Sequence, residues 1–335
     1  MNNLLEHEVN EILQNVFPVN HNNSKEEIIN LFQTKNNINI LWGVQPRNLP
    51  NLEFLIPILQ IIKFLKYGYR VTILLADIHE LLDSPHLNLK ILKNRCDAYK
   101  ELISQFVELF DINSGNICYI YGTEFQTSSN YTLDIYKLSS LVSIKETYNS
   151  REIDMNELDI SINSSEKKMT QMLYPILQAL DEKYTDCDVF YGSITQKNIC
   201  KFTSSLMNNF RKYDKKVIYL LQDLTKKISI SFFDPLDSII FKLEDFDCDE
   251  INYLSEHILF PLLKYRNDIM IIDDNKINNY EDFIKYQTEK NIDKQKIIEI
   301  ISKYLSKHLD KFYDDLIRSK FTKYYNDGWI GITNY

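Results

Sequence analysis

The chain has few cysteines and histidines, and neither residue type is clustered. Its five cysteines are scattered through 335 residues without a CxxC pair, which argues against a disulfide framework and against a zinc site built on cysteine pairs. The six histidines are equally dispersed, so no metal-ligand spacing can be found. We therefore expect buried free thiols and no bound metal.

Long apolar runs and a basic N-terminal start are also lacking. No apolar stretch approaches the length of a membrane span, and the first residues, MNNLLEHEVNEILQNVF, carry acids where a secretory signal carries basic residues. We expect a protein that is neither embedded in a membrane nor exported. Cytosol or nucleus is the default location, and our prediction is the cytoplasm.

Positive charge is scarce overall but concentrated near the C-terminus. A formal net charge of −9 discourages nucleic-acid binding if it is spread evenly. Residues 285–323, however, contain ten Lys or Arg against six Asp or Glu. The acidic run at 243–250 fits a solvated loop or helix start. For the basic stretch, a nucleic-acid face competes with a plain solvated, lysine-rich helix.

Short β-rich runs alternate with helical stretches, which is typical of an α/β fold. The chain is long enough for a large core and two domains. Apolar residues at helical spacing predict a helix over 51–66. Mostly apolar strands, as expected of a parallel sheet covered on both faces, are predicted at 38–42, 70–75, 117–121, 188–191 and 216–221.

These patterns divide the chain into four parts. We predict a helical N-terminal segment at 1–36, a sheet domain at 37–222, a linker at 223–248 and a helical domain at 249–335. Residues 147–168 are polar and predict an excursion over the surface.

One predicted helix carries three polar side chains on one face. Tyr174, Gln178 and Asp181 are spaced i, i+4 and i+7 within an otherwise apolar stretch, which points them to the same side. Unpaired buried polar groups are costly. Either these groups meet water or a neighbouring loop at the helix edge, or they bind a small polar ligand. Spacing alone leaves both alternatives open.

Several stretches resemble eukaryotic-type tyrosyl-tRNA synthetases in the same order along the chain. They are Leu41-Trp42-Gly43, Pro50 and Pro57, Val71 to His79, Tyr131 to Asp134, Leu173 to Asp181 and His257 to Leu262. The resemblance covers nearly the whole chain. It implies a class I Rossmann-type catalytic domain with a parallel sheet and helices on both faces. It also implies an all-helical, anticodon-binding-like C-terminal domain and a homodimer built through the catalytic domains.

The resemblance also assigns a tyrosine pocket. Tyr174 and Gln178 match residues that hold the substrate's amino group, Asp181 matches the one that binds its phenolic hydroxyl, and Gln196 matches another pocket residue. Leu41 stands where the family usually has a tyrosine that shares this hydroxyl with the aspartate. We therefore expect weaker selectivity against phenylalanine, with Asp181 alone left to recognise the hydroxyl.

The ATP half of the resemblance does not match. The first signature, an H-I-G-H-type turn, falls on Asn51-Leu52-Glu53-Phe54, where Asn51 lacks an imidazole and Glu53 brings bulk and negative charge. The glycine expected upstream is Asn48, and the family's ribose-binding carboxylate is replaced by Thr195. The remnants of the ATP site are Gly43, Asn51, Glu53, Gly192 and Thr195.

The second signature, a mobile K-M-S-K-S-type loop, aligns with Lys227-Ile228-Ser229-Ile230-Ser231 and lacks its loop glycine. Lys226 and Lys227 could still meet phosphates, but the Ile-Ser-Ile-Ser-Phe alternation is equally typical of a half-buried strand. No catalytic residue is assigned. Asn51, Lys226, Lys227 and Ser229 are remnants of the two signatures.

Three functions stay open. Removing one group that stabilises transition-state charge costs about 10²- to 10³-fold in turnover, and several are altered here. We expect a degenerate homologue that binds tyrosine weakly and no cofactor tightly, with tRNA(Tyr) or a tRNA-like RNA as partner, in a homodimer or a heteromer with a paralogue. The alternatives are a divergent but active tyrosine–tRNA ligase, which would use ATP with Mg, and a structural subunit with an idle pocket.

Overall fold

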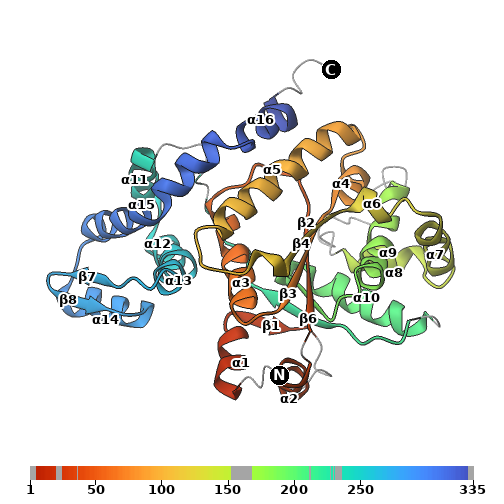
Figure 1. The fold of residues 1–335 in the computed structure, drawn as a ribbon, viewed down its shortest axis with the longest axis horizontal. Coiled ribbons are helices and arrows are strands. Elements are labelled where there is room, and N and C mark those ends of the chain that lie inside the picture. The colour runs from red at the N-terminus through yellow and green to blue at the C-terminus, as the bar shows by residue number, and fades with distance from the viewer. Residues whose placement is uncertain are drawn as a thin grey trace, which may run out of the picture.

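The computed structural model describes residues 5–19, 25–35, 37–151, 168–210, 213–226, 228, 230 and 236–330. Six strands form one sheet in the order β1-β6-β5-β2-β3-β4 (Figure 1). Their bounds are β1 Val16–Pro18, β2 Asn39–Val44, β3 Arg70–Leu75, β4 Ile117–Tyr121, β5 Val189–Ser193 and β6 Ile218–Gln222. Five strands are parallel and β1 pairs antiparallel with β6. The five predicted strands are confirmed to within two residues.

Alternate side chains of the strands enter two different cores, one on each face of the sheet. Ile40 and Trp42 join a large core with helices α3 (Leu55–Lys66) and α5 (Leu89–Val107). Leu41 packs instead with residues of α10 (Lys197–Asn209). The predicted α/β class with helices on both faces is therefore confirmed. α3 is apolar on nearly all sides, as expected of a helix enclosed by protein.

The remaining helices of this part surround the sheet. They are α1 Glu6–Ile12, α2 Lys25–Thr34, α4 Asp77–Asp83, α6 Gly122–Phe125, α7 Ser129–Ser139, α8 Ile144–Ser150 and α9 Met169–Tyr184, with short 3₁₀ turns at Leu52–Phe54, Ser114–Asn116 and Ile194–Gln196. The predicted excursion at 147–168 overlaps α8, where Thr147 and Ser150 are buried. Its first residues are therefore packed helix, and residues 152–167 lie outside the described ranges.

Strand β1 corrects the helical assignment of the N-terminal segment. Its three residues pair with β6 in the register Val16↔Gln222, Phe17↔Leu221 and Pro18↔Leu220. The strand is too short to show period-two alternation and ends on a proline, which normally argues against a strand interior. Its pairing depends on contacts about 200 residues away in the sequence, which a local pattern cannot reveal.

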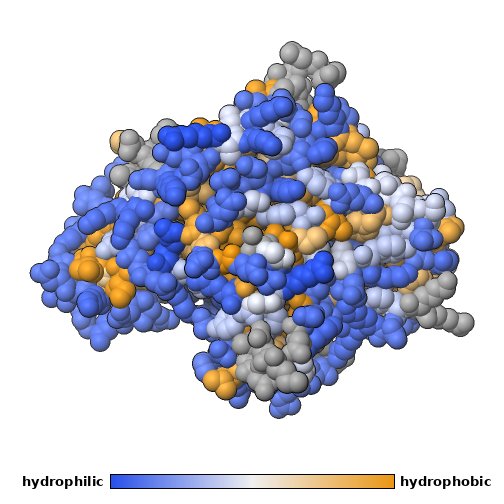
Figure 2. Space-filling model, in the orientation of Figure 1, coloured by the Kyte–Doolittle hydropathy of each residue, from blue (hydrophilic) through white to orange (hydrophobic). Residues whose placement is uncertain are grey.

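The C-terminal region is helical apart from one hairpin. Its elements are α11 Leu236–Asp245, α12 Cys248–Leu254, α13 Phe260–Tyr265, α14 Tyr280–Lys290, α15 Lys294–Arg318 and α16 Phe321–Tyr325, with π-helical turns at Ser255–Leu259 and Asn326–Ile330 and strands β7 Met270–Ile272 and β8 Asn275–Ile277. The hairpin turns at Asp273 and Asp274, both with positive φ. Aspartate tolerates this conformation, but without a glycine the turn carries a weak sequence signal. Figure 2 shows apolar atoms exposed over this hairpin, where Ile269 and Ile271 are partly exposed.

The large core continues from the sheet into the C-terminal helices. Phe106 of α5 meets Phe312 of α15 edge to face, with 5.2 Å between ring centroids, and both belong to the same hydrophobic cluster. The two regions therefore pack on each other through an apolar interface. Across the described ranges, each helix is too short or too polar to cross a membrane.

Candidate functional site

A pocket opens beside the carboxyl ends of the central parallel strands, where α/β sheets usually bind ligands. It contains about 460 Å³ of empty space, part of it open to solvent. The five residues expected on the tyrosine side, Leu41, Tyr174, Gln178, Asp181 and Gln196, all line it, together with Gly43, Gln45, Leu74, Ala76, His79 and Phe190. This size and lining suit a small molecule with an apolar body and a few polar groups.

Asp181 is the buried polar centre of the pocket. Its Oδ1 accepts hydrogen bonds from Gln126 Nε2 at 2.7 Å and from the Tyr131 hydroxyl at 2.8 Å. Burial raises its pKa to about 7, against the opposing effect of these two donors. Its Oδ2 lies 3.5 Å from His79 Nε2. Burial lowers the pKa of His79 to about 4, so the imidazole is neutral at physiological pH and leaves Oδ2 without a charged partner.

Tyr174 is held between two side chains that the sequence did not single out. The His79 ring meets it edge to face at 4.6 Å between centroids, and the Arg151 guanidinium lies 4.1 Å from the centre of its ring. Its hydroxyl donates to Gln45 Oε1 at 3.3 Å. A ligand amino group would therefore compete with Gln45 for this hydroxyl. Gln178 is buried, and no partner in the described chain hydrogen-bonds its amide.

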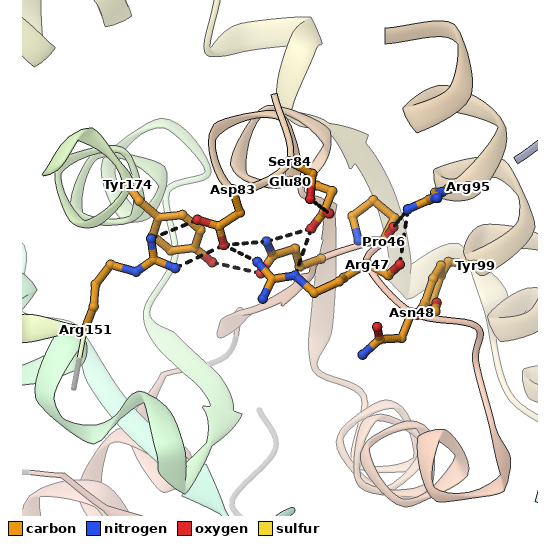
Figure 3. Close-up of polar contacts among 11 residues, drawn as sticks. Pro46, Arg47, Asn48, Glu80, Asp83, Ser84, Arg95, Tyr99, Arg151 and Tyr174 are labelled. Carbon is orange, nitrogen blue, oxygen red and sulfur yellow. Dashed lines mark hydrogen bonds and ion pairs between the residues drawn. The ribbon is translucent and has the colours of Figure 1, made fainter. Parts of the chain in front are cut away.

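A network of charges adjoins the pocket at Gln45 and Tyr174 (Figure 3). Arg151 binds Asp83 through two hydrogen bonds of 2.8 and 3.0 Å, and Arg47 contacts both Asp83 and Glu80. The Gln45 amide donates to the same two carboxylates. Burial alone would raise the pKa of Asp83, but the donors and arginine charges around it lower the pKa below its ordinary value. In this network two arginines are paired with two carboxylates, so its charges balance.

Side chains of α5 hold the loop that follows β2 through hydrogen bonds to its backbone. Arg95 of α5 donates to the carbonyl oxygen of Arg47 at 3.1 Å, and the Tyr99 hydroxyl donates to that of Asn48 at 2.8 Å (Figure 3). Arg95 also donates to the carbonyl oxygen of Gly328, near the C-terminal end, at 2.9 Å. Through Arg95, the C-terminal region thus helps to hold the loop that carries Gln45 and Arg47.

The remnants of the two signatures are bound to each other. The Glu53 carboxylate accepts a hydrogen bond from the backbone N–H of Ile228 at 2.8 Å. The backbone N–H of Leu52 donates to the carbonyl oxygen of Ile230, also at 2.8 Å. Ile228 and Ile230 are 1% and 0% exposed. Both isoleucines are therefore buried, but neither lies in a β-strand, and the alternate positions of the predicted half-buried strand lie outside the described residues.

Other signature residues take different positions. Asn51 is extended and its side chain makes no capping hydrogen bond to the 3₁₀ turn that follows. Lys226 lies over the ring of Tyr253, with 5.3 Å from Nζ to the centroid. Lys227 and Ser229 lie outside the described residues, so the phosphate contact expected of Lys227 stays a prediction.

Gly192 lies near the end of β5, and Thr195 and Gln196 lie in the 3₁₀ turn that follows. Gln196 Oε1 accepts from the backbone N–H of Ser193 at 3.0 Å. A Cβ at position 192 would lie 2.2 Å from that oxygen, so a larger residue there would displace the Gln196 amide. Thr195 is exposed and its hydroxyl donates to Ser193 Oγ. At Gly43, by contrast, an added Cβ would meet nothing within 4 Å.

Comparison with known proteins places this site in a family. A family model described as tRNA synthetases class I (W and Y) matches residues 33–232, more than half of the chain. The chain belongs to this family. Within the class I tRNA synthetases it is similar to a probable cytoplasmic tyrosine--tRNA ligase of Vairimorpha ceranae, with 28% identity over 88% of the chain and 89% of the relative.

Other class I tRNA synthetases agree with this placement. A cytoplasmic tyrosine--tRNA ligase of Xenopus tropicalis is 28% identical over 88% of the chain, which spans 58% of that longer protein. The fold is similar to a tyrosyl-tRNA synthetase from Archaeoglobus fulgidus complexed with L-tyrosine, with a TM-score of 0.77, 20% identity and coverage of 92% of this chain and 98% of the other. In this synthetase fold, no group of three His, Cys, Asp or Glu among the described residues could hold a metal ion.

Proposed function

We propose that the protein is a tyrosyl-tRNA synthetase homologue that binds tyrosine but does not form the tyrosyl adenylate. The observation that carries this proposal is the contact between Glu53 and Ile228. A carboxylate occupies the turn that faces the triphosphate in the family. It also ties down the segment that aligns with the family's mobile phosphate-binding loop.

The nucleotide side does not fit ATP. Glu53 is anionic and repels a triphosphate, while Ile228 and Ile230 fill the interior with apolar side chains. Neither isoleucine can donate a side-chain hydrogen bond to a phosphate oxygen. Catalysis at a phosphate depends on preorganised positive charge and hydrogen-bond donors. At Glu53 this site has a negatively charged acceptor instead.

The tyrosine side fits a phenolic amino acid better. Asp181 keeps one carboxylate oxygen for a hydroxyl, and the Gln178 amide has no protein partner in the described chain. The apolar walls supplied by Leu41, Leu74 and Phe190 suit the ring. Because Tyr174 is already bonded to Gln45, we expect weak affinity, with a dissociation constant on the order of 0.1 to 1 mM.

The partners we propose are a second protein chain, tRNA and tyrosine. α7, α8 and the turn between them expose Leu133, Tyr136, Leu141 and Ile144, each more than half exposed, which suits a dimer contact through the catalytic-like domain. The partner chain is a second copy or a paralogue. A cytoplasmic location is supported by the names of the related ligases.

Tyrosine-dependent exchange of pyrophosphate into ATP tests this proposal against an active ligase. We expect exchange at the level of a reaction without tyrosine. An intact tyrosyl-tRNA synthetase assayed in parallel shows that the reagents work. Turnover in the ordinary range of about 1 to 10³ s⁻¹ would establish the active alternative. If neither tyrosine nor tRNA binds, the structural-subunit alternative replaces the proposal.

A further inference from the structure

A second groove is lined mainly by residues of α3, by residues between Glu256 and Tyr265, and by residues 278–281 at the start of α14. It contains about 850 Å³ of empty space, part of it open to solvent. Its basic end is lined by Lys63 of α3, Lys264 of α13, and Gln14 and Asn15 of the turn before β1. None of these residues belongs to the tyrosine pocket or to the two signature segments.

Among the described residues, Lys63 has no acidic partner at hydrogen-bond distance. It is 8% exposed and shares its face of α3 with Gln60, and its Nζ donates to the carbonyl oxygen of Gln14 at 3.3 Å. A lysine ammonium has three donors, and a buried charge is costly unless it is paired. Burial and the charge of Lys264 together lower the pKa of Lys63 to about 8.

The surrounding charges leave this end short of anions. Lys264 is 2.7 Å from Glu11, and Glu11 is the carboxylate that acts on Lys63, Lys66 and Lys264 alike. Lys66 lies over the Tyr265 ring outside the groove lining. Three ammonium groups therefore share one carboxylate.

Two further carboxylates line the groove at its other end. Glu256 and Glu281 both act on Tyr280, and neither is among the charges that act on Lys63. Among the described residues, neither carboxylate forms an ion pair with Lys63 or Lys264.

We propose that the basic end of this groove binds a small phosphate-bearing anion, with Lys63 as its principal ligand. Lysine binds phosphate as a point charge, and the amides of Gln14 and Asn15 line the same end as further donors. The anion would supply the charge that three neighbouring ammonium groups lack.

Calorimetric titration with inorganic phosphate and with AMP tests the proposal, and ³¹P NMR provides a second readout. We expect saturable binding of phosphate below about 10 mM. Lys63→Met should weaken it at least about tenfold, because it removes the charge and keeps the length of the side chain. Lys66→Met is the matched control, since it makes the same change on the same helix outside the lining, and it should weaken binding much less than Lys63→Met does.

Comparison of AMP with inorganic phosphate shows whether the ligand is a nucleotide or free phosphate. Tighter binding of AMP than of phosphate, lost in Lys63→Met, identifies a nucleotide ligand, whereas equal binding identifies free phosphate. Equal binding of acetate would overturn the phosphate assignment. If Lys63→Met does not fold, Lys264→Met, which removes the second ammonium in the lining, must weaken binding instead. Absence of saturable phosphate binding, or binding unaltered by both variants, overturns the proposal.

Discussion

The Glu53 carboxylate and the Ile228 backbone N–H, 175 positions apart in the chain, form a hydrogen bond of 2.8 Å. It joins the turn before α3 to the segment after β6. The neighbouring bond between Leu52 and Ile230 makes this a two-point connection. These two hydrogen bonds hold the segment that aligns with the family's mobile loop, and one of them is made to an anionic side chain.

Glu53→Ala should destabilise the protein by about 1 to 3 kcal/mol, because it leaves a partly buried N–H without its charged acceptor. Glu53→Gln should cost less, since its side-chain carbonyl can still accept the bond. Urea unfolding measures both changes, and hydrogen exchange of the Ile228 amide locates them. Equal exchange protection in the alanine variant and the wild type would contradict this connection.

Restoring Asn51→His, Glu53→Ala and Thr195→Asp together should recover some ATP binding, whereas each single restoration should do little. Groups that act as a unit contribute non-additively, and the anchored segment opposes a triphosphate until the Glu53 carboxylate is removed. Calorimetry with ATP is the measurement, with the wild type as reference. Full recovery by one substitution would show that a single residue, rather than the whole site, limits ATP binding.

Tyrosine should bind with a dissociation constant on the order of 0.1 to 1 mM, and Asp181→Ala should reduce the preference for tyrosine over phenylalanine. Asp181 is the buried carboxylate among the residues that line the pocket. Ligand-observed NMR with both amino acids measures the preference. Asp188→Ala, a buried aspartate outside the pocket lining, is the control. An unchanged preference in Asp181→Ala would remove Asp181 from hydroxyl recognition.

Asp181→Asn should stabilise the protein at pH 8 by about 1 to 4 kcal/mol. Burial raises the pKa of Asp181 to about 7, so the folded state holds a proton between about pH 4 and pH 7 that the unfolded state has lost. The contribution of Asp181 to the free energy of unfolding therefore falls as pH rises through this range and is constant above it. Asparagine has no charge to bury, and its carbonyl can accept from Gln126 and Tyr131.

Asp188→Asn should have the opposite effect and serves as the control for this pH dependence. Burial would raise the pKa of Asp188, but hydrogen bonds from Lys215 and Lys35 bring it below its ordinary value. The native carboxylate therefore stabilises the fold above that ordinary value and loses this effect in acid. Unfolding by guanidinium at several pH values follows both variants. Stabilisation by both substitutions would contradict the assignment for Asp188.

Any tRNA binding should depend on the lysines of α15 and weaken as salt rises, because phosphate contacts release counterions. The lysines to neutralise together are Lys294, Lys296, Lys303 and Lys307. Two of them already contact acids, Lys296 with Asp273 and Lys307 with Asp268, so binding has to replace these pairs. Filter binding across a salt series is the measurement, with neutralisation of Lys90, Lys93 and Lys100 on α5 as control. Salt-insensitive binding would move the contact elsewhere.

Apolar runs made the sheet predictable from sequence. Strands such as β3, whose last five residues are all buried, can be predicted from their own apolar sequence without knowledge of the strands they pair with. The polar face of α9 was equally visible, and the pocket does contain Tyr174, Gln178 and Asp181 together. The resemblance added Leu41 and Gln196, which local spacing could not connect with that helix.

The partners of these residues were not predictable, because they come from distant segments. Gln126 and His79 reach Asp181, and Arg151 covers Tyr174, through contacts that no spacing rule describes. Some signal existed, since Tyr131 and His79 both lie in stretches that carried the family resemblance. The Glu53 contact with Ile228 had no such signal. A glutamate in that turn predicts that phosphate is repelled. It does not predict that the glutamate carboxylate accepts a hydrogen bond from the backbone of the second signature segment.

Strand β1 limits how this protein can associate with other chains. It forms one border of the sheet with only three residues, and one of them, Pro18, has no N–H to offer a further strand. Continuous sheets between two molecules therefore cannot grow from this border, even though Phe17 is exposed there. Self-association of this chain is therefore directed to helical surfaces or to β4, the five-residue strand at the opposite border.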